Sequence, residues 1–524
     1  MNGIGFRNFR RFKELNSLPL GGINLFVGGN NAGKSTVVKG MLLLIDFLKN
    51  QKVSSSNLFE TPKFRFDGPG AHDVNIDTFK RALCWNTKEK EIIFYASIED
   101  FVVDVCIYNN TPEDMGYAFV KSINLEDKKT GLKFLFDIVN AKTIVSYSSN
   151  EQEENLQEQI EKLDKELSVL NEEISKMNSV ELSEEEGKKL FDRVAAKAHL
   201  DAALANYRGA LEGAKKETIQ IRLQQSLSGN YSYIYSYLQG LIDFVDVSMS
   251  ASKNKKAEKS ELNEEDFSWI KQHLFEIQDA NTRFEQAVQK LSVEYVYSHD
   301  ANQRVIFNKK DENDFVSQSI HEFYNQRITS ESEIGKKMLF WLKEFCDIDD
   351  YKVETVQGVA YRFTLKSGEK WIDLADMGRG TIQLVTLFVR LASIIKQYAG
   401  KKDVPIVLVE EPEQNLHPAY QSDLLDVFYE IFQEYGIRFI LETHSEYLVR
   451  TLQLKVASIL NNKDSDVSLD EVNSQYIVYY FPHQGEPYSM NFLMNGRFEN
   501  NFDTGFYDQA GSLNVQLIKV GKEG

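Results

Sequence analysis

The sequence predicts an α/β fold with a helical insertion between its two halves. Near the N-terminus, the apolar strand 23–27 passes through a glycine-rich loop into a helix. Near the C-terminus, the apolar runs 405–411 and 438–443 are typical of buried strands, and both end in polar residues. Between these regions, residues 151–227 show heptad spacing, which indicates paired helices instead of a sheet.

The composition is that of an ordinary globular protein. The 524 residues suffice for two or more domains, with 42% apolar and 26% charged residues. Cys84, Cys106 and Cys346 have no metal-like spacing, which fits buried thiols in a reducing compartment. The apolar run 40–49 is too short to span a bilayer, and the N-terminus lacks the apolar core of a signal peptide. We therefore expect a cytoplasmic protein without membrane association.

The charge balance limits the expected partners. A net charge of −18 disfavours non-specific binding along a phosphate backbone, although a focused nucleic-acid site stays open. The basic group of Arg7, Arg10 and Arg11 is expected to form a solvated face.

Residues 1–150 are predicted to form the first part of the α/β domain. The runs 3–12 and 22–28 read as strands, and a helix follows over 36–49. The β-rich stretch 90–148 is expected to contain two strands or a hairpin.

Two heptad seams dominate residues 151–227, with a polar break at 178–189 between them. Their 4-3 spacing predicts an antiparallel coiled-coil hairpin, and the alternative is a pair of amphipathic helices packed on the body. The first seam is Leu156, Ile160, Leu163, Leu167, Leu170, Ile174 and Met177; the second is Leu200, Leu204, Tyr207, Leu211, Ala214, Thr218 and Ile221.

The rest of the chain divides into two parts. Residues 228–350 are predicted to be a mainly helical insertion with a possible short strand at 293–298. Residues 351–524 return to alternating strands and helices, and should complete the α/β domain.

The glycine-rich loop has the pattern of a phosphate-binding loop. In GGNNAGKST, at 28–36, Gly28 is followed after four residues by Gly33, Lys34 and Ser35, between a strand and a helix. Backbone N–H groups and the helix N-terminus would bind phosphates, Lys34 would reach the β- and γ-phosphates, and Ser35 would bind Mg²⁺. The expected nucleotide-binding residues for ATP are Gly28, Asn30, Asn31, Ala32, Gly33, Lys34, Ser35 and Thr36.

Two adjacent glutamates end the strand at 405–411. A phosphate loop needs a carboxylate at the end of a neighbouring strand to hold Mg²⁺, and Glu410 stands in that place. Glu411, one residue later, is the candidate general base for the attacking water. The alternative is a surface turn, in which glutamate and proline are ordinary.

A histidine follows the strand at 438–443. His444 could sense or stabilise the γ-phosphate, while a purely structural histidine is the alternative. The candidate catalytic residues are therefore Lys34, Glu411 and His444.

These segments resemble the ABC-type ATPases of the SMC, RecF and OLD group. FRNFRRFKELNSLPLGGINLFVGGNNAGKST resembles that group's opening strand pair and phosphate loop, LVEEPEQNLHP its Walker B and D-loop, and LETHSEYLVRTLQ its switch-histidine segment. DMGRGTIQL, at 376–384, is similar to the G-x-G-x-x-Q signature of OLD-like ATPases. The resemblance implies an ABC-type P-loop ATPase head with an inserted antiparallel coiled-coil hairpin and a helical insertion.

The resemblance also implies a homodimer or higher oligomer that forms through the ATPase heads. The signature segment of one subunit would complete the ATP site of the other, through Gly378, Gly380, Thr381 and Gln383. ATP would close the two heads and hydrolysis would release them.

Two functions follow from this resemblance. The first is an ATP hydrolase subunit of a bacterial antiphage defence system, similar to Septu, PARIS and retron-associated ATPases. Such a subunit would respond to DNA or a phage-derived trigger. It would control a separate effector protein, which is expected to be a nuclease. No intrinsic nuclease is expected, because the acidic DSD at 464–466 stands in a polar loop. The alternative is a RecF- or SMC-like DNA repair ATPase that clamps DNA. A transporter subunit is disfavoured by the heptad seams and the signature sequence.

Overall fold

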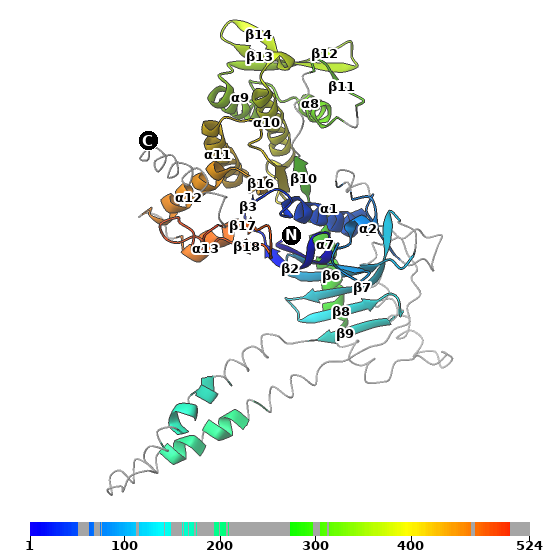
Figure 1. Ribbon diagram of the computed structural model, residues 1–524, viewed down its shortest axis with the longest axis vertical. Helices are drawn as coiled ribbons and strands as arrows, with labels where there is room; N and C mark the ends of the chain where they lie inside the picture. The colour runs from blue at the N-terminus through cyan, green and yellow to red at the C-terminus, as the bar shows by residue number, and fades with distance from the viewer. Residues whose placement is uncertain are drawn as a thin grey trace, which may run out of the picture.

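The structure is a computed structural model, and its described residues lie in several separate stretches. These are 1–50, 62–67, 74, 76–111, 115–140, 142–147, 273–296, 304–311, 314–462 and 467–502, together with 160, 162–165, 167–171, 174, 193–198, 200–205 and 208 within the heptad region. Three β-sheets with helices between and around them form the body of the molecule (Figure 1).

A six-stranded sheet carries the predicted site. Its order is β10-β15-β16-β3-β17-β18, and all neighbours are parallel except β17 and β18. The strands are β3 (Ile23–Gly28), β10 (Val293–Val296), β15 (Ile406–Glu410), β16 (Arg438–Thr443), β17 (Tyr476–Phe481) and β18 (Tyr488–Ser489). The expectation that the strand ending in Glu410 neighbours β3 is wrong, because β16 lies between them. The possible strand at 293–298 is present as β10, at the edge of this sheet.

The two faces of this sheet belong to different hydrophobic cores. Leu408 and Ile440 face the core that contains α1, whereas Val409 and Leu441 face the core that contains α10, α11 and α12. This split follows from the alternation of side chains along each strand. The helices are α1 (Lys34–Asn50), α7 (Leu274–Lys290), α10 (Arg379–Tyr398), α11 (Pro418–Tyr435), α12 (Glu446–Leu460) and α13 (Leu469–Gln475).

An eight-stranded antiparallel sheet packs on the α1 side. Its order is β2-β1-β5-β6-β7-β8-β9, with β4 paired to β7, and a short helix, α2 (Phe79–Ala82), lies beside it. The strands are β1 (Gly3–Phe9), β2 (Phe12–Pro19), β4 (Lys63–Arg65), β5 (Glu91–Ile98), β6 (Phe101–Tyr108), β7 (Tyr117–Asp127), β8 (Leu132–Asp137) and β9 (Lys142–Tyr147). The prediction of two strands or a hairpin over 90–148 is therefore wrong, because that stretch supplies five strands. The turn at Glu99, in the left-handed region (φ 50°), divides one apolar run into β5 and β6.

A small four-stranded sheet lies at one end of the molecule, above α8, α9 and α10 in Figure 1. It consists of β11 (Phe307–Asn308), β12 (Asp350–Val356), β13 (Ala360–Ser367) and β14 (Lys370–Asp373), and it packs with α8 (Phe315–Asn325) and α9 (Glu333–Cys346). The chain then passes through a short 3-10 helix, Leu374–Asp376, and enters α10. The small sheet therefore leads directly into the predicted signature segment.

Most of the predicted coiled-coil hairpin lies outside the described residues. The described residues on both sides of the break are helical, and Arg208, which follows the break, donates from Nη2 to Asp164, which precedes it, at 3.0 Å. The acidic segment 464–466 also lies outside the described residues. Within the described part of the chain, no helix has the length and apolar character needed to cross a membrane.

Candidate functional site

The loop between β3 and α1 has a backbone that requires glycine at two positions. Gly28 has φ +146°, and a Cβ there would lie 2.3 Å from the carbonyl oxygen of Phe481. Gly33 has φ +101°, and its Cβ would lie 2.6 Å from Cδ of Arg11. The loop ends at Lys34, the first residue of α1. The N–H groups in the first turn of a helix have no acceptor within the helix. Such a loop and helix start form a site for phosphate.

Arg11 supports this loop from the side. Its Nη1 donates to the carbonyl of Asn31 at 3.0 Å, and its Nη2 donates to the carbonyls of Pro482 and His483, each at 3.2 Å. The prediction of a solvated face is therefore wrong for Arg11, which connects β17's end to the phosphate loop. No local pattern in the sequence distinguishes Arg11 from its basic neighbours, because its partners come from distant segments.

Lys34 is buried at the centre of the site. Only 3% of the residue is exposed, and burial lowers its pKa below the usual range. Its Nζ donates to the carbonyls of Gly28 at 3.1 Å and Gly29 at 3.0 Å, and lies 3.2 Å from Nε2 of His444. The lysine of the loop and the histidine after β16 therefore meet, although 410 residues separate them.

Glu411 and His444 form the second contact of the site. Oε1 of Glu411 lies 3.5 Å from Nε2 of His444, and this interaction holds the pKa of Glu411 below its usual range. Nε2 of His444 also faces Lys34, and it can form only one of these two hydrogen bonds in a given tautomer. When Nε2 carries a proton, it donates to Glu411; when it does not, it accepts from Lys34. The backbone N–H of Glu411 donates to the carbonyl of Glu442 at 2.7 Å. Glu411 has a φ of +41°, and such a strained backbone conformation is typical of functional sites. The carboxylate is 38% exposed, so water reaches it.

Glu413 fixes the backbone at His444. The residue is 8% exposed, and its Oε1 accepts the N–H of His444 at 2.7 Å. Burial raises the pKa of this carboxyl group. Glu413 has no assigned role from the sequence, where it reads as part of a polar turn; the structure shows that it positions the histidine.

Glu410 and Glu442 lie side by side at the ends of β15 and β16. The two residues are paired in register. Each lies two positions after a residue that faces the α1 core, Leu408 on β15 and Ile440 on β16, and alternate residues of a strand point to the same face. Glu410 and Glu442 therefore both face α1. Glu442 is 6% exposed, and its Oε1 accepts from Ser35 Oγ at 2.7 Å. Burial raises the pKa of Glu442 to about 7. Its position directly before Thr443 and His444 is the one signal in the sequence that could have drawn attention to it.

The predicted signature segment begins α10. Gly378 is the N-cap of this helix, and a Cβ on it would have no atom within 4 Å. In contrast, a Cβ on Gly380 would lie 2.7 Å from the carbonyl of Asn415, whose side-chain Nδ2 donates to Gln383 Oε1 at 3.1 Å. The segment therefore packs against the loop after β15 within the same chain, and leaves Gly378 open. Thr381 forms a side-chain hydrogen bond with Cys346.

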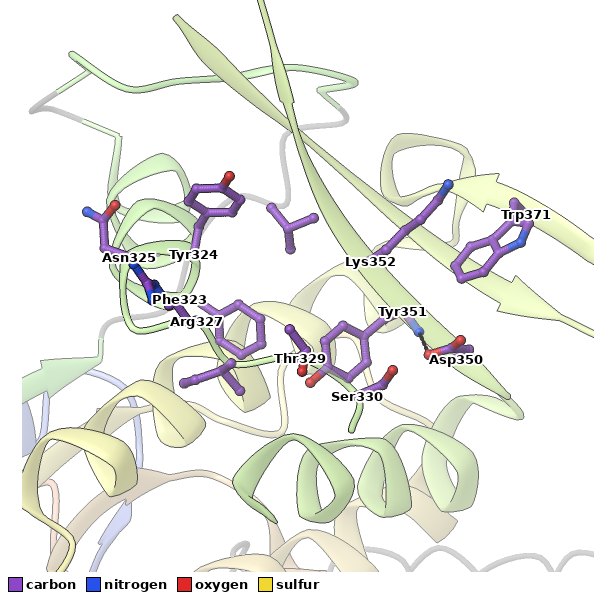
Figure 2. A pocket seen from close by; sticks show the side chains of 12 residues that line it. Phe323, Tyr324, Asn325, Arg327, Thr329, Ser330, Asp350, Tyr351, Lys352 and Trp371 are labelled. Atoms are coloured by element: carbon purple, nitrogen blue, oxygen red, sulfur yellow. Dashed lines mark hydrogen bonds between the residues drawn. The ribbon is translucent and has the colours of Figure 1, made fainter. Parts of the chain in front are cut away.

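A separate cavity lies outside this cluster. It has a volume of about 810 Å³ and lies between the end of α8 and β12 (Figure 2). Tyr324 and Arg327 border it on the helix side, and Lys352 stacks on Trp371, with Nζ 4.9 Å from the ring centroid, on the sheet side. No residue of the phosphate loop lines it. We assign this cavity no part in the phosphate chemistry.

Comparison with known proteins decides the family. A sequence model of the AAA ATPase domain family matches residues 1–449. The chain belongs to this family. The matched residues of this AAA ATPase domain include the phosphate loop, both glutamates and His444. Membership implies ATP binding, and ATPases of this kind typically use Mg²⁺.

Solved structures give weak similarities. One is the Smc head domain with an extended coiled coil bound to the C-terminal domain of ScpA, from Pyrococcus furiosus, with 10% identity, a TM-score of 0.30 and coverage of 98% of both chains. Another is the SmcHead bound to the C-winged helix domain of ScpA, with 11% identity, a TM-score of 0.31 and coverage of 94% of this chain and 97% of that one. These TM-scores are too low to carry an argument. No curated protein matches this chain.

The residues around Ser35 fit Mg²⁺. The side chains available there, Ser35, Glu410 and Glu442, offer only oxygen donors, which Mg²⁺ prefers. Oε2 of Glu442 is buried and has no hydrogen-bond partner among the described residues, so an acceptor is left for a cation. The AAA ATPase domain therefore has a suitable donor set on the side of α1 where the phosphate loop ends.

Proposed function

We propose that this AAA ATPase domain hydrolyses ATP at the carboxyl ends of β3, β15 and β16. The observation that carries the proposal is the direct meeting of Lys34, His444 and Glu411 beside the phosphate loop. The loop N–H groups and Lys34 would hold the phosphates, and the exposed carboxylate of Glu411 would accept a proton from the attacking water. Mg²⁺, held by Ser35 and Glu410, would neutralise charge on the phosphates.

The proposal includes ATP-dependent closure of two copies. Gly378, Gly380, Thr381 and Gln383 would face the γ-phosphate bound by the partner copy, through the N–H groups that open α10. The open space at Gly378 supports this role, since a helix N-terminus without a covering side chain is accessible to a phosphate from outside.

The substitution Gly378→Ala tests closure. The added methyl group meets nothing within the chain, and Gly378 has a φ of −63° that alanine adopts, so the subunit should keep its melting temperature. In a Glu411→Gln background, the ATP-induced dimer measured by light scattering should weaken about tenfold or more, because the methyl group lies between the helix start and the γ-phosphate. Gln397→Ala, at the exposed far end of α10, is the matched control and should leave the dimer unchanged. Dimerisation of Gly378→Ala at the control level would refute a trans contact at this glycine.

We further propose that the ATP switch controls a separate effector, a nuclease, in bacterial antiphage defence. Support comes from the resemblance to OLD-like ATPases together with a family match that spans residues 1–449. DNA or a phage-derived molecule would act as the trigger.

Purification with the products of neighbouring genes tests this role. We expect an effector to co-elute, and deletion of the ATPase gene should raise phage plating efficiency. Absence of a partner together with unchanged plating would reject the defence role. If, instead, the isolated protein binds DNA in an ATP-stimulated and salt-dependent manner without any effector, the DNA-clamp function replaces it.

A further inference from the structure

Glu442 is a buried carboxylate that the proposed chemistry does not yet use. It lies at the end of β16, faces α1 and is 6% exposed. Its Oε1 accepts from Ser35 Oγ at 2.7 Å, but its Oε2 is buried without a hydrogen-bond partner among the described residues. A buried acceptor without a partner is unfavourable, so such an atom generally has a partner in the functional state.

The carboxylates around Glu442 favour the binding of a further cation. Glu410 is its in-register neighbour on β15, and Glu411 follows directly, so three carboxylates lie close together. Lys34 is the nearby cation, but its ammonium group already contacts the carbonyls of Gly28 and Gly29 and the ring of His444. One lysine therefore leaves this group of carboxylates with excess negative charge next to the buried side chain of Glu442.

The spacing of the two oxygens matches an Mg²⁺ coordination shell. Octahedral Mg²⁺ with ligands at about 2.1 Å places adjacent ligand oxygens about 3 Å apart. Ser35 Oγ and Glu442 Oε1 are 2.7 Å apart. A metal ion can therefore replace the hydrogen bond between them with a small movement of either side chain, and leave both as adjacent ligands.

We propose that Glu442 is a direct Mg²⁺ ligand beside Ser35 when the site holds ATP, a role that rests on the proposed ATPase function. Glu410 then contacts the metal shell from the neighbouring strand, through water. The Ser35–Glu442 hydrogen bond holds both oxygens in place before the metal arrives, which reduces the rearrangement on binding.

The test measures the metal dependence of nucleotide binding, not turnover. A fluorescent ATP analogue is titrated into the full chain at a series of free Mg²⁺ concentrations, for the wild type, Glu442→Gln and Glu442→Ala. The glutamine of Glu442→Gln retains an oxygen that can accept a hydrogen bond from Ser35 but lacks the negative charge. This variant therefore distinguishes a role of Glu442 as metal ligand from a role as hydrogen-bond acceptor only. Glu294→Gln is the matched control, since Glu294 is a carboxylate on β10 of the same sheet, with a side chain that is 15% exposed and accepts from Arg390 instead of Ser35.

We expect Glu442→Gln and Glu442→Ala both to require at least tenfold more Mg²⁺ for half-maximal binding, with equal affinity to wild type in EDTA. Glu294→Gln should keep the wild-type Mg²⁺ requirement. A shift below threefold in Glu442→Gln, including the case in which only Glu442→Ala is shifted, overturns the proposal, because Glu442 would then only accept from Ser35. Mn²⁺ bound per chain, counted by electron paramagnetic resonance, provides a second readout and should fall in both Glu442 variants. If the wild type binds no nucleotide with Mg²⁺, the proposed ATPase function fails as well, and this outcome differs from a shift limited to Glu442.

Discussion

Lys34→Ala is expected to weaken ATP binding by about 100-fold or more, and hydrolysis should fall below detection. The ammonium group lies within the phosphate loop, with Nζ 3.0–3.1 Å from the carbonyl oxygens of Gly28 and Gly29. Charge-assisted hydrogen bonds contribute about 1.5–3 kcal/mol each, and about 2.7 kcal/mol corresponds to 100-fold in affinity. Isothermal titration with ATP and Mg²⁺ measures the loss.

The fold should survive this substitution. Lys34 belongs to neither hydrophobic core, so its replacement leaves the packing of α1 in place and the melting temperature should change little. Lys39→Ala, on the same helix but partly exposed, is the matched control and should bind ATP normally. ATP binding by Lys34→Ala at the wild-type level would show that the loop does not hold the phosphates.

Glu411→Gln is expected to reduce the hydrolysis rate about 10²- to 10³-fold while ATP binding is retained. The carboxylate is 38% exposed, and its contact with His444 holds its pKa low, so it is charged and accessible to water at neutral pH. Removal of a general base typically costs this factor. Glutamine keeps the size and the backbone contact of residue 411 with Glu442, so the loop geometry should persist. Phosphate release and light scattering should show slow turnover and a lasting ATP-bound dimer.

The control for this prediction replaces a carboxylate outside the site. Glu430→Gln, on an exposed position of α11, should hydrolyse ATP at the wild-type rate. Hydrolysis by Glu411→Gln at that same rate would exclude Glu411 as the base, and Glu442 or Glu413 would then be the next carboxylates to test.

Local patterns predict several elements of the fold well. The apolar run before Gly28 is β3, the run that ends in Glu410 is β15, and the run before His444 is β16. Each of these is a short buried strand with a polar end, which a single segment of sequence encodes. The predicted nucleotide-binding residues lie together in one loop and the first turn of α1 for the same reason, since they are close together in the sequence.

One local turn and several long-range contacts explain the failures. The strands β5 and β6 are separated only by a turn at Glu99, so the apolar stretches on both sides of Glu99 read as one run. Arg11 reads as an ordinary basic residue, because its partners Pro482 and His483 are more than 470 residues away in the chain. Glu413 lies in a polar turn and gains its role only from the N–H of His444.

The sequence by itself determined the phosphate loop, the strand ends at Glu410 and His444, and membership of a nucleotide-binding class, because these depend on residue types at short spacings. Only the tertiary structure decided which carboxylate accompanies Ser35. Glu442 lies 407 residues from Ser35, and it meets Ser35 because β16, instead of β15, is the strand next to β3. Strand order follows from how crossover helices pack on the two faces of the sheet, and no short segment of sequence records it.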